Sequence, residues 1–112
     1  MPNSNATIEI DCAALRSKLD LAEPLTLIDC REPAEHELVA IEGSTLIPMN
    51  DTPARIDEYR SLPAPVVVYC HHGSRSLQVV NWLRSHGVEQ VQSLRGGIDE
   101  WSLSVDRNLP RY

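Results

Sequence analysis

The apolar run PVVVY, residues 65–69, constrains the fold more than any other stretch of this sequence. Consecutive β-branched residues favour an extended strand. An apolar run without polar alternation is typical of a parallel strand that is covered on both faces of its sheet. Parallel strands need crossover connections, which are usually helices. The run therefore predicts an α/β protein in which this strand is deeply buried.

The rest of the chain alternates short apolar runs with amphipathic stretches, as this class of fold requires. Strands are expected at residues 7–10, 25–29, 44–48, 65–69 and 89–94, and helices after Asp11 and at residues 32–38, 54–60, 76–87 and 96–103. Asp11 is placed to cap the first helix, Pro33 suits a first helical turn, and Gly87 suits a helix end. Strand followed by helix, repeated along the chain, predicts a mostly parallel central sheet of about five strands flanked by helices.

The size of the chain indicates one domain. Its 112 residues allow a single hydrophobic core, so one domain is expected over residues 1–112, with residues 105–112 as a C-terminal tail. The opening MPNSNATIEI has no charged head followed by an apolar segment, and no apolar run is long enough for a membrane span. Neither a secretory leader nor a membrane partner is therefore expected.

Charge and cysteine content narrow the function further. The net charge of -6 argues against nucleic acid or an anionic membrane surface as a partner, because both require a basic footprint. Cys12, Cys30 and Cys70 are widely spaced and show no metal-type pairing, so no cysteine metal site is expected. Free thiols fit a reducing, cytoplasmic environment.

Cys70 is the candidate nucleophile. It follows the buried strand directly, and ligand sites in parallel sheets lie at the carboxyl ends of the strands. The loop leads into a helix N-terminus, which stabilises negative charge, and Gly73 allows backbone N–H groups to converge. Arg75 adds a permanent positive charge, and a thiol becomes a nucleophile by ionising. The main-chain N–H groups of residues 71–76 are expected to form an anion cradle, with Ser74 or Ser76 as a further helix cap.

The spacing from Cys70 to Arg75 is one residue shorter than the spacing that cysteine-dependent phosphatases use. One residue contributes roughly 3.5 Å of contour, so removing one shrinks the radius of a near-circular cradle by about 0.5 Å. A tetrahedral phosphoryl group would then fit poorly, whereas one extra sulfur atom on the cysteine would fit well. The loop length favours a cysteine persulfide and disfavours a phosphatase.

Three stretches in order carry a resemblance to a known family: LIDCREPAE at residues 27–35, CHHGSRS at 70–76 and LRGGIDEW at 94–101. Together they resemble the rhodanese (sulfurtransferase) family over nearly the whole chain. The resemblance implies transfer of a sulfane sulfur from thiosulfate or a similar small donor, through a Cys70 persulfide, to a thiol or protein acceptor. It also places the family's active loop at residues 70–75 and requires no cofactor.

Several side chains have two interpretations. Cys30 ends a neighbouring strand, so it could be a resolving thiol for Cys70 or a small core residue where the family often carries valine. His71 and His72 could form an electropositive rim that attracts an anionic donor and protonates a leaving group, or could simply face solvent. The two glycines Gly96 and Gly97 are expected to let the backbone pass close to the active loop.

The charged residues at neighbouring strand ends are candidate support for the site. Asp29 is a plausible ion-pair partner for Arg75, although an acidic residue there could equally cap the next helix. Arg31 and Arg95 could add positive charge to the rim or remain solvated. Two rival functions stay open beside the sulfurtransferase: a non-catalytic interaction module with the same fold, and a thiol redox sensor.

Overall fold

The computed structural model describes residues 7–112. The expected absence of a leader falls mainly on residues 1–6, which lie outside the described residues. Within residues 7–112, no helix has the combination of length and apolar character needed to cross a bilayer.

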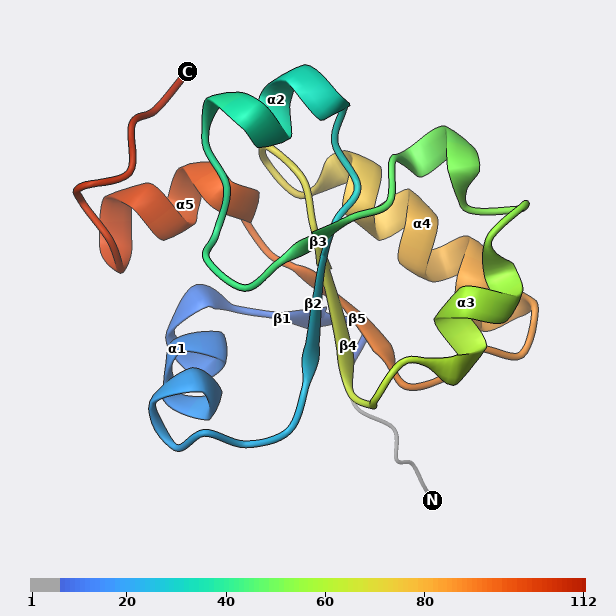
Figure 1. Ribbon diagram of the computed structural model, residues 1–112. Coiled ribbons are helices and arrows are strands. Elements are labelled where there is room, and N and C mark those ends of the chain that lie inside the picture. The colour runs from blue at the N-terminus through green and yellow to red at the C-terminus, as the bar shows by residue number, and fades with distance from the viewer. Residues whose placement is uncertain (1–6) are drawn as a thin grey trace.

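Five strands form one parallel sheet in the order β1-β5-β4-β2-β3 (Figure 1). The strands are β1 (Glu9–Ile10), β2 (Thr26–Asp29), β3 (Thr45–Leu46), β4 (Val66–Tyr69) and β5 (Val91–Leu94). β4 is the middle strand, and all four of its residues are buried, as the apolar run predicts. The predicted fold class, a parallel sheet of about five strands flanked by helices, is confirmed.

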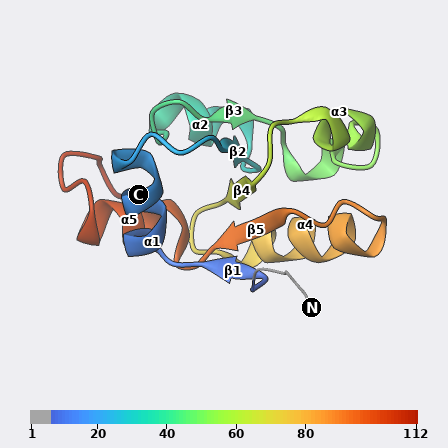
Figure 2. The same cartoon turned by 90° about the horizontal axis from the view of Figure 1, so that it is seen from below.

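Helices cover both faces of the sheet. They are α1 (Cys12–Asp20), α2 (Pro33–Leu38), α3 (Ile56–Ser61), α4 (Ser74–Ser85) and α5 (Gly97–Ser104), with a short 3-10 turn, η2, at Met49–Asp51. Figure 2 shows α1 and α5 together on one side of the sheet and α3 and α4 on the other. In Figure 1, α2 lies beyond the strand ends that lead into α2 and α4, near the C-terminus.

The alternation of side chains along β4 divides the hydrophobic core into two clusters. Val66, Val68 and the following Cys70 pack with residues of α3 and α4. Val67 and Tyr69 pack on the opposite face with residues of α1 and α5. Because side chains of a strand point alternately to opposite faces, Cys70 faces α4. The strand therefore delivers its terminal cysteine to the start of that helix.

The predicted ends of the elements differ from the observed ones by a few residues. The helix expected at 76–87 begins earlier, at Ser74, because Gly73 adopts a left-handed conformation (φ 107°) and serves as its N-cap. The strand expected at 44–48 is reduced to Thr45–Leu46 at the edge of the sheet. The predicted cap is confirmed, since the backbone N–H of Ala14 donates to Asp11 Oδ1 at 2.8 Å.

Candidate active site

The Cys70 sulfur sits inside a loop of converging donors. The backbone N–H groups of Gly73 and Ser76 point to Sγ at 3.1 and 3.3 Å. The Ser76 hydroxyl lies 3.5 Å from the same sulfur. Both N–H groups belong to the first residues of α4 or its cap, where amides have no partner within the helix. The sequence therefore builds part of the predicted cradle from the helix N-terminus itself.

Gly97 allows a second backbone segment to pack closely against this loop. A side chain at Gly97 would collide with the carbonyl oxygens of Cys70 and His71. Those carbonyls instead accept hydrogen bonds from Ile98 and Asp99 N–H groups at 2.9 and 3.0 Å. Gly97 also has a positive φ of 62°, which glycine adopts at low cost. The expected close approach of this segment to the active loop is observed.

Cys30 lies beside Cys70. Strands β2 and β4 pair with Asp29 opposite Tyr69, so the residues that follow, Cys30 and Cys70, come next to each other. The Cys30 N–H donates to the Tyr69 carbonyl at 3.0 Å. Both cysteines are buried in the same core cluster, and the neighbouring Cys30 thiol lowers the pKa of Cys70. Cys30 is thus both a core residue and a neighbour of the candidate nucleophile.

These contacts determine which thiol ionises. The hydrogen bond from Cys30 lowers the pKa of Cys70 most, burial opposes it, and the Ser76 and Gly73 donors bring the pKa to about 5. The pKa of Cys30 is raised, first because it holds its proton against Cys70 and then by burial. Burial raises the pKa of Cys12 to about 11. Among the three cysteines, Cys70 is therefore the one that is a thiolate at neutral pH.

The rate of Cys70 alkylation by iodoacetamide should show this ionisation directly. Because the pKa is lowered, the thiolate is present above about pH 5 and is lost as the pH falls through that value. We therefore expect the rate to rise near pH 5 and to be level at pH 7, far below the free-cysteine midpoint of about 8.5. Peptide mass analysis assigns the modified residue. A midpoint at or above the free value would show that the loop does not stabilise an anion.

Two substitutions at Cys30 separate its hydrogen bond from its volume. Cys30→Val fills the core without a donor, and Cys30→Ser keeps a hydroxyl donor. We expect valine to raise the alkylation midpoint by about one pH unit or more, which corresponds to about 1.4 kcal/mol, and serine to raise it less. Identical midpoints in the wild type and Cys30→Val would show that Cys30 does not donate to the thiolate.

Arg75 has a different partner from the predicted one. Its guanidinium binds the Glu35 carboxylate of α2 through two hydrogen bonds, of 2.8 and 3.0 Å. The prediction that Asp29 pairs with Arg75 is wrong, because Asp29 is fully buried and binds Arg31 at 2.7 Å and His36 at 2.8 Å. Glu35 projects from the first turn of α2 and reaches the loop from the side.

Arg31 is neither a rim residue nor a solvated one, which corrects both interpretations of its sequence position. Its side chain is completely buried, and its Nε and Nη2 donate to the two Asp29 oxygens at 2.9 and 2.7 Å. Its Nη2 also donates to the Val39 carbonyl, and its Nη1 donates to the Tyr112 hydroxyl at 2.7 Å. The buried Arg31 side chain therefore links the end of β2 to the segment after α2 and to the C-terminal tyrosine through hydrogen bonds.

The two loop histidines and Arg95 make contacts with neighbouring side chains at the surface around the loop. The His71 ring stacks between the rings of His72 and Tyr112, each with its centroid 3.9 Å away. The His72 side chain is largely exposed and its Nε2 lies 3.8 Å from Asp99. Arg95 is also largely exposed and pairs with Glu9 at 3.3 Å, as the solvated alternative requires.

Sequence reasoning missed the part that the C-terminal residues play. Residues 105–112 were expected to form a tail, yet Tyr112 stacks on His71 and donates a hydrogen bond to Glu35 at 2.7 Å. Arg111 binds both oxygens of Asp99, at 2.9 and 3.2 Å. No pattern within these residues signals that contact, because it depends on how the chain returns after α5.

One group of side chains in residues 7–112 has the chemistry of a metal site. Ligand atoms of His71, His72 and Asp99 lie within 4.8 Å of one another. Both oxygens of Asp99 are already bound by Arg111, which would have to leave before the carboxylate could coordinate an ion. The arrangement is thus a hydrogen-bonded rim of the loop in the present conformation.

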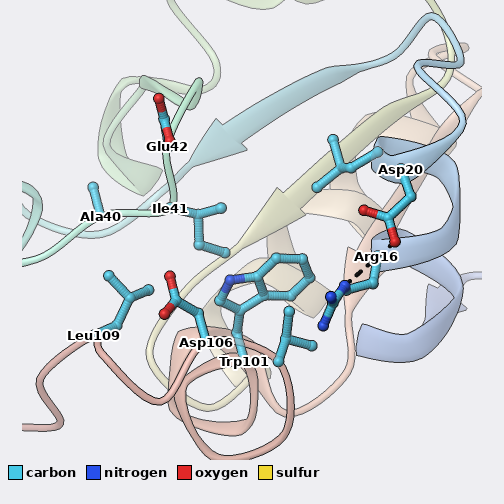
Figure 3. Close-up of a pocket in the computed structure, with 10 residues that line it drawn as sticks. Arg16, Asp20, Ala40, Ile41, Glu42, Trp101, Asp106 and Leu109 are labelled. Carbon is cyan, nitrogen blue, oxygen red and sulfur yellow. Dashed lines mark ion pairs between the residues drawn. The ribbon is translucent and has the colours of Figure 1, made fainter.

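A hollow of about 540 Å³ lies between α1, α5 and the segment after α2 (Figure 3). Trp101 and Ile41 contribute apolar surface to it, and the ion pair of Arg16 with Asp20, 3.4 Å apart, lies beside it. None of its lining residues belongs to the loop at residues 70–76. The hollow is therefore separate from the candidate active site.

Comparison with known proteins decides the family. A family model described as Rhodanese-like domain matches residues 11–104, which include all three sequence stretches and the whole cysteine loop. The chain belongs to the rhodanese family. This confirms the resemblance drawn from the sequence.

Relatives of this rhodanese domain differ in length. A protein named Sulfurtransferase from Allochromatium vinosum is 37% identical over 94 residues, covering 84% of this chain and 87% of that protein. The Rhodanese-like/PpiC domain-containing protein 12, chloroplastic, of Arabidopsis thaliana is 34% identical over 110 residues, covering 93% of this chain. The chain spans only 37% of the Arabidopsis protein.

Solved structures give the same result for the fold. The crystal structure of a rhodanese-related protein from Thermoplasma volcanium superposes with a TM-score of 0.76 and is 27% identical, covering 88% of this chain and 94% of the other. The rhodanese fold is therefore shared over nearly the whole described chain.

Proposed function

We propose that this rhodanese domain is an enzyme, a sulfurtransferase in which Cys70 carries the sulfur as a persulfide. The observation that supports this best is the environment of the Cys70 sulfur, which receives the Gly73 and Ser76 N–H groups and has a pKa of about 5. A thiolate at the base of a short anion-binding loop is a nucleophile, and the loop length favours one added sulfur atom over a phosphoryl group. The similar proteins named sulfurtransferase support the same reaction class.

The proposed reaction has two balanced steps. The Cys70 thiolate attacks the outer sulfur of thiosulfate or a similar donor, the S–S bond of the donor breaks, and sulfite leaves with the bonding electron pair. The product is Cys70–S–S⁻, whose terminal sulfur the same loop can stabilise. A thiophilic acceptor, such as cyanide in an assay or a thiol or protein in the cell, then attacks that sulfur and releases the Cys70 thiolate.

The residues around Cys70 have separate proposed roles. The Gly73 and Ser76 N–H groups stabilise both the thiolate and the terminal sulfur of the persulfide. His71 and His72 form the rim where the donor arrives and the leaving group departs.

Free thiols at all three cysteines are compatible with the reducing cytoplasm as the location of the protein.

A thiol redox sensor is the second candidate, and the contact of Cys30 with Cys70 is the observation that favours it. Oxidation would join the two sulfurs, and such a mechanism would need both cysteines equally. The raised pKa of Cys30 disfavours it, because the protonated thiol is a poor nucleophile.

Steady-state transfer of sulfur from thiosulfate to cyanide, measured as thiocyanate, tests the proposed function. Hydrolysis of a small aryl phosphate by the same preparation is the parallel control. We expect turnover of the sulfur donor and none of the phosphate ester, because the loop is one residue too short for a phosphoryl group. Efficient phosphate hydrolysis, or a folded protein that turns over no sulfane donor, would contradict the proposal.

A further inference from the structure

The positive charge of the active loop is already compensated in this structure. Arg75 lies close enough to Cys70 for their charges to interact. Its guanidinium, however, is bound by both oxygens of Glu35, at 2.8 and 3.0 Å. The side chains are 32% and 20% exposed, so the pair is partly shielded from water. An incoming anion therefore meets a neutral pair rather than a free cation.

Glu35 is held in place from two further sides. Its Oε1 accepts the backbone N–H of Glu32 at 3.0 Å, which closes the capping box of α2. Its Oε2 accepts the Tyr112 hydroxyl at 2.7 Å, and that hydroxyl in turn accepts a hydrogen bond from the buried Arg31. The Arg75 guanidinium holds the pKa of Glu35 well below its usual range. The carboxylate is thus charged and fixed against the loop.

The other two arginines that hydrogen-bond to groups near the loop are compensated as well. Arg31 is paired with Asp29, and Arg111 is paired with Asp99. With these pairs neutral, the Cys70 thiolate adds a negative charge at the mouth of the loop that none of the pairs balances. Such a mouth repels a dianion more strongly than a monoanion, since the energy scales with the product of the charges.

From this arrangement we infer that Glu35, held by Tyr112, is a specificity-determining residue that selects the sulfur donor by its charge. The inference rests on the proposed sulfurtransferase function and names its donor class. Sulfane donors with at most one negative charge, such as persulfides of thiols, are favoured over the thiosulfate dianion. With a persulfide donor, the Cys70 thiolate takes the outer sulfur of R–S–S⁻, the S–S bond breaks, and the thiolate R–S⁻ leaves.

Thiosulfate and methanethiosulfonate form a matched pair of donors for the test. Both offer one terminal sulfane sulfur, but thiosulfate carries two negative charges and methanethiosulfonate carries one. The measurement is kcat/KM for each donor, with cyanide as the acceptor, in the wild type and in Glu35→Gln. Glutamine keeps the shape and can still accept the Glu32 N–H. We expect the ratio of thiosulfate to methanethiosulfonate efficiency to rise about fivefold to tenfold in Glu35→Gln at low salt.

Glu37→Gln is the matched control, because Glu37 lies on the same helix, is exposed, and its loss changes the net charge by the same amount. It should leave the ratio unchanged. Suppose that the wild type uses both donors. If Glu35→Gln then shows the same ratio of donor efficiencies as the wild type, or if the ratio rises equally in Glu37→Gln, the inference is overturned but the proposed function is not. A folded wild type that uses neither donor would overturn the proposed function, and the inference with it.

Ionic strength gives a second test that needs no variant. If Glu35 compensates the charge of Arg75, salt can screen only repulsion between thiosulfate and the site. The kcat/KM of the wild type for thiosulfate should then stay level or rise as the ionic strength increases from about 0.02 to about 0.2 M. A steep fall over that range would show a net cationic mouth and would contradict the inference.

Discussion

Replacing Cys70 by serine is expected to reduce sulfur transfer by more than about a thousandfold, because a serine hydroxyl stays protonated near neutral pH and cannot form a persulfide. The substitution replaces the polarisable sulfur by an oxygen and leaves the loop donors in place. The fold should therefore persist, and circular dichroism and thermal unfolding would verify it. The measurement is thiocyanate production from thiosulfate and cyanide.

The other two cysteines serve as matched controls for this loss. Cys12→Ser should retain most of the activity, because Cys12 is buried in the opposite core cluster with a raised pKa. Cys30→Ser should also retain most of it, since a hydroxyl can replace the thiol as a donor to Cys70. A folded Cys30→Ser variant as inactive as Cys70→Ser would favour a two-thiol redox mechanism instead.

Replacing Asp29 by asparagine is expected to lower the free energy of unfolding by about 3–5 kcal/mol, the usual cost of leaving a buried charge without its partner. Arg31 and Asp29 both have fully buried side chains. Asparagine has the same size but removes the negative charge that two guanidinium nitrogens contact at 2.9 and 2.7 Å. It also removes the charge that His36 meets at 2.8 Å. Chemical denaturation followed by circular dichroism measures the loss.

The control for Asp29→Asn is Glu9→Gln, which breaks another arginine–carboxylate pair in the same sheet. Arg95 in that pair is 64% exposed, so the expected loss is below about 1 kcal/mol. If Asp29→Asn were no more costly than Glu9→Gln, the Arg31 charge would not depend on Asp29. The idea that this pair organises the strand ends would then fail.

Local sequence signals predicted the scaffold of the site well. The run at residues 65–69 contains the buried middle strand β4 (Val66–Tyr69), and Cys70 directly follows that strand. Gly73 and Gly97 have the positive φ values that mark sharp turns and close backbone approach. These features depend on residues that are near one another in the sequence, so their physical causes are visible there.

The partners of the charged residues could not be predicted in the same way. The Arg75–Glu35 pair joins α4 to α2, and Tyr112 reaches Glu35 from the end of the chain. These contacts depend on strand order and on the path after α5, neither of which the local pattern contains. From the sequence alone, Arg31 is predicted to lie at the surface, because arginine is rarely buried without a partner. Its actual partner, Asp29, is predicted from the sequence to pair with Arg75 or to cap the next helix.

The mass of the protein after incubation with a sulfane donor tests the central claim most directly. We predict that wild-type protein treated with thiosulfate or a polysulfide, and then freed of donor, is heavier by one sulfur atom. Peptide analysis should place that atom on Cys70, and a thiol reductant should remove it. Cys70→Ser should gain nothing. A folded wild type that acquires no reductant-labile sulfur at Cys70 from any sulfane donor would contradict the account and favour a non-catalytic interaction module.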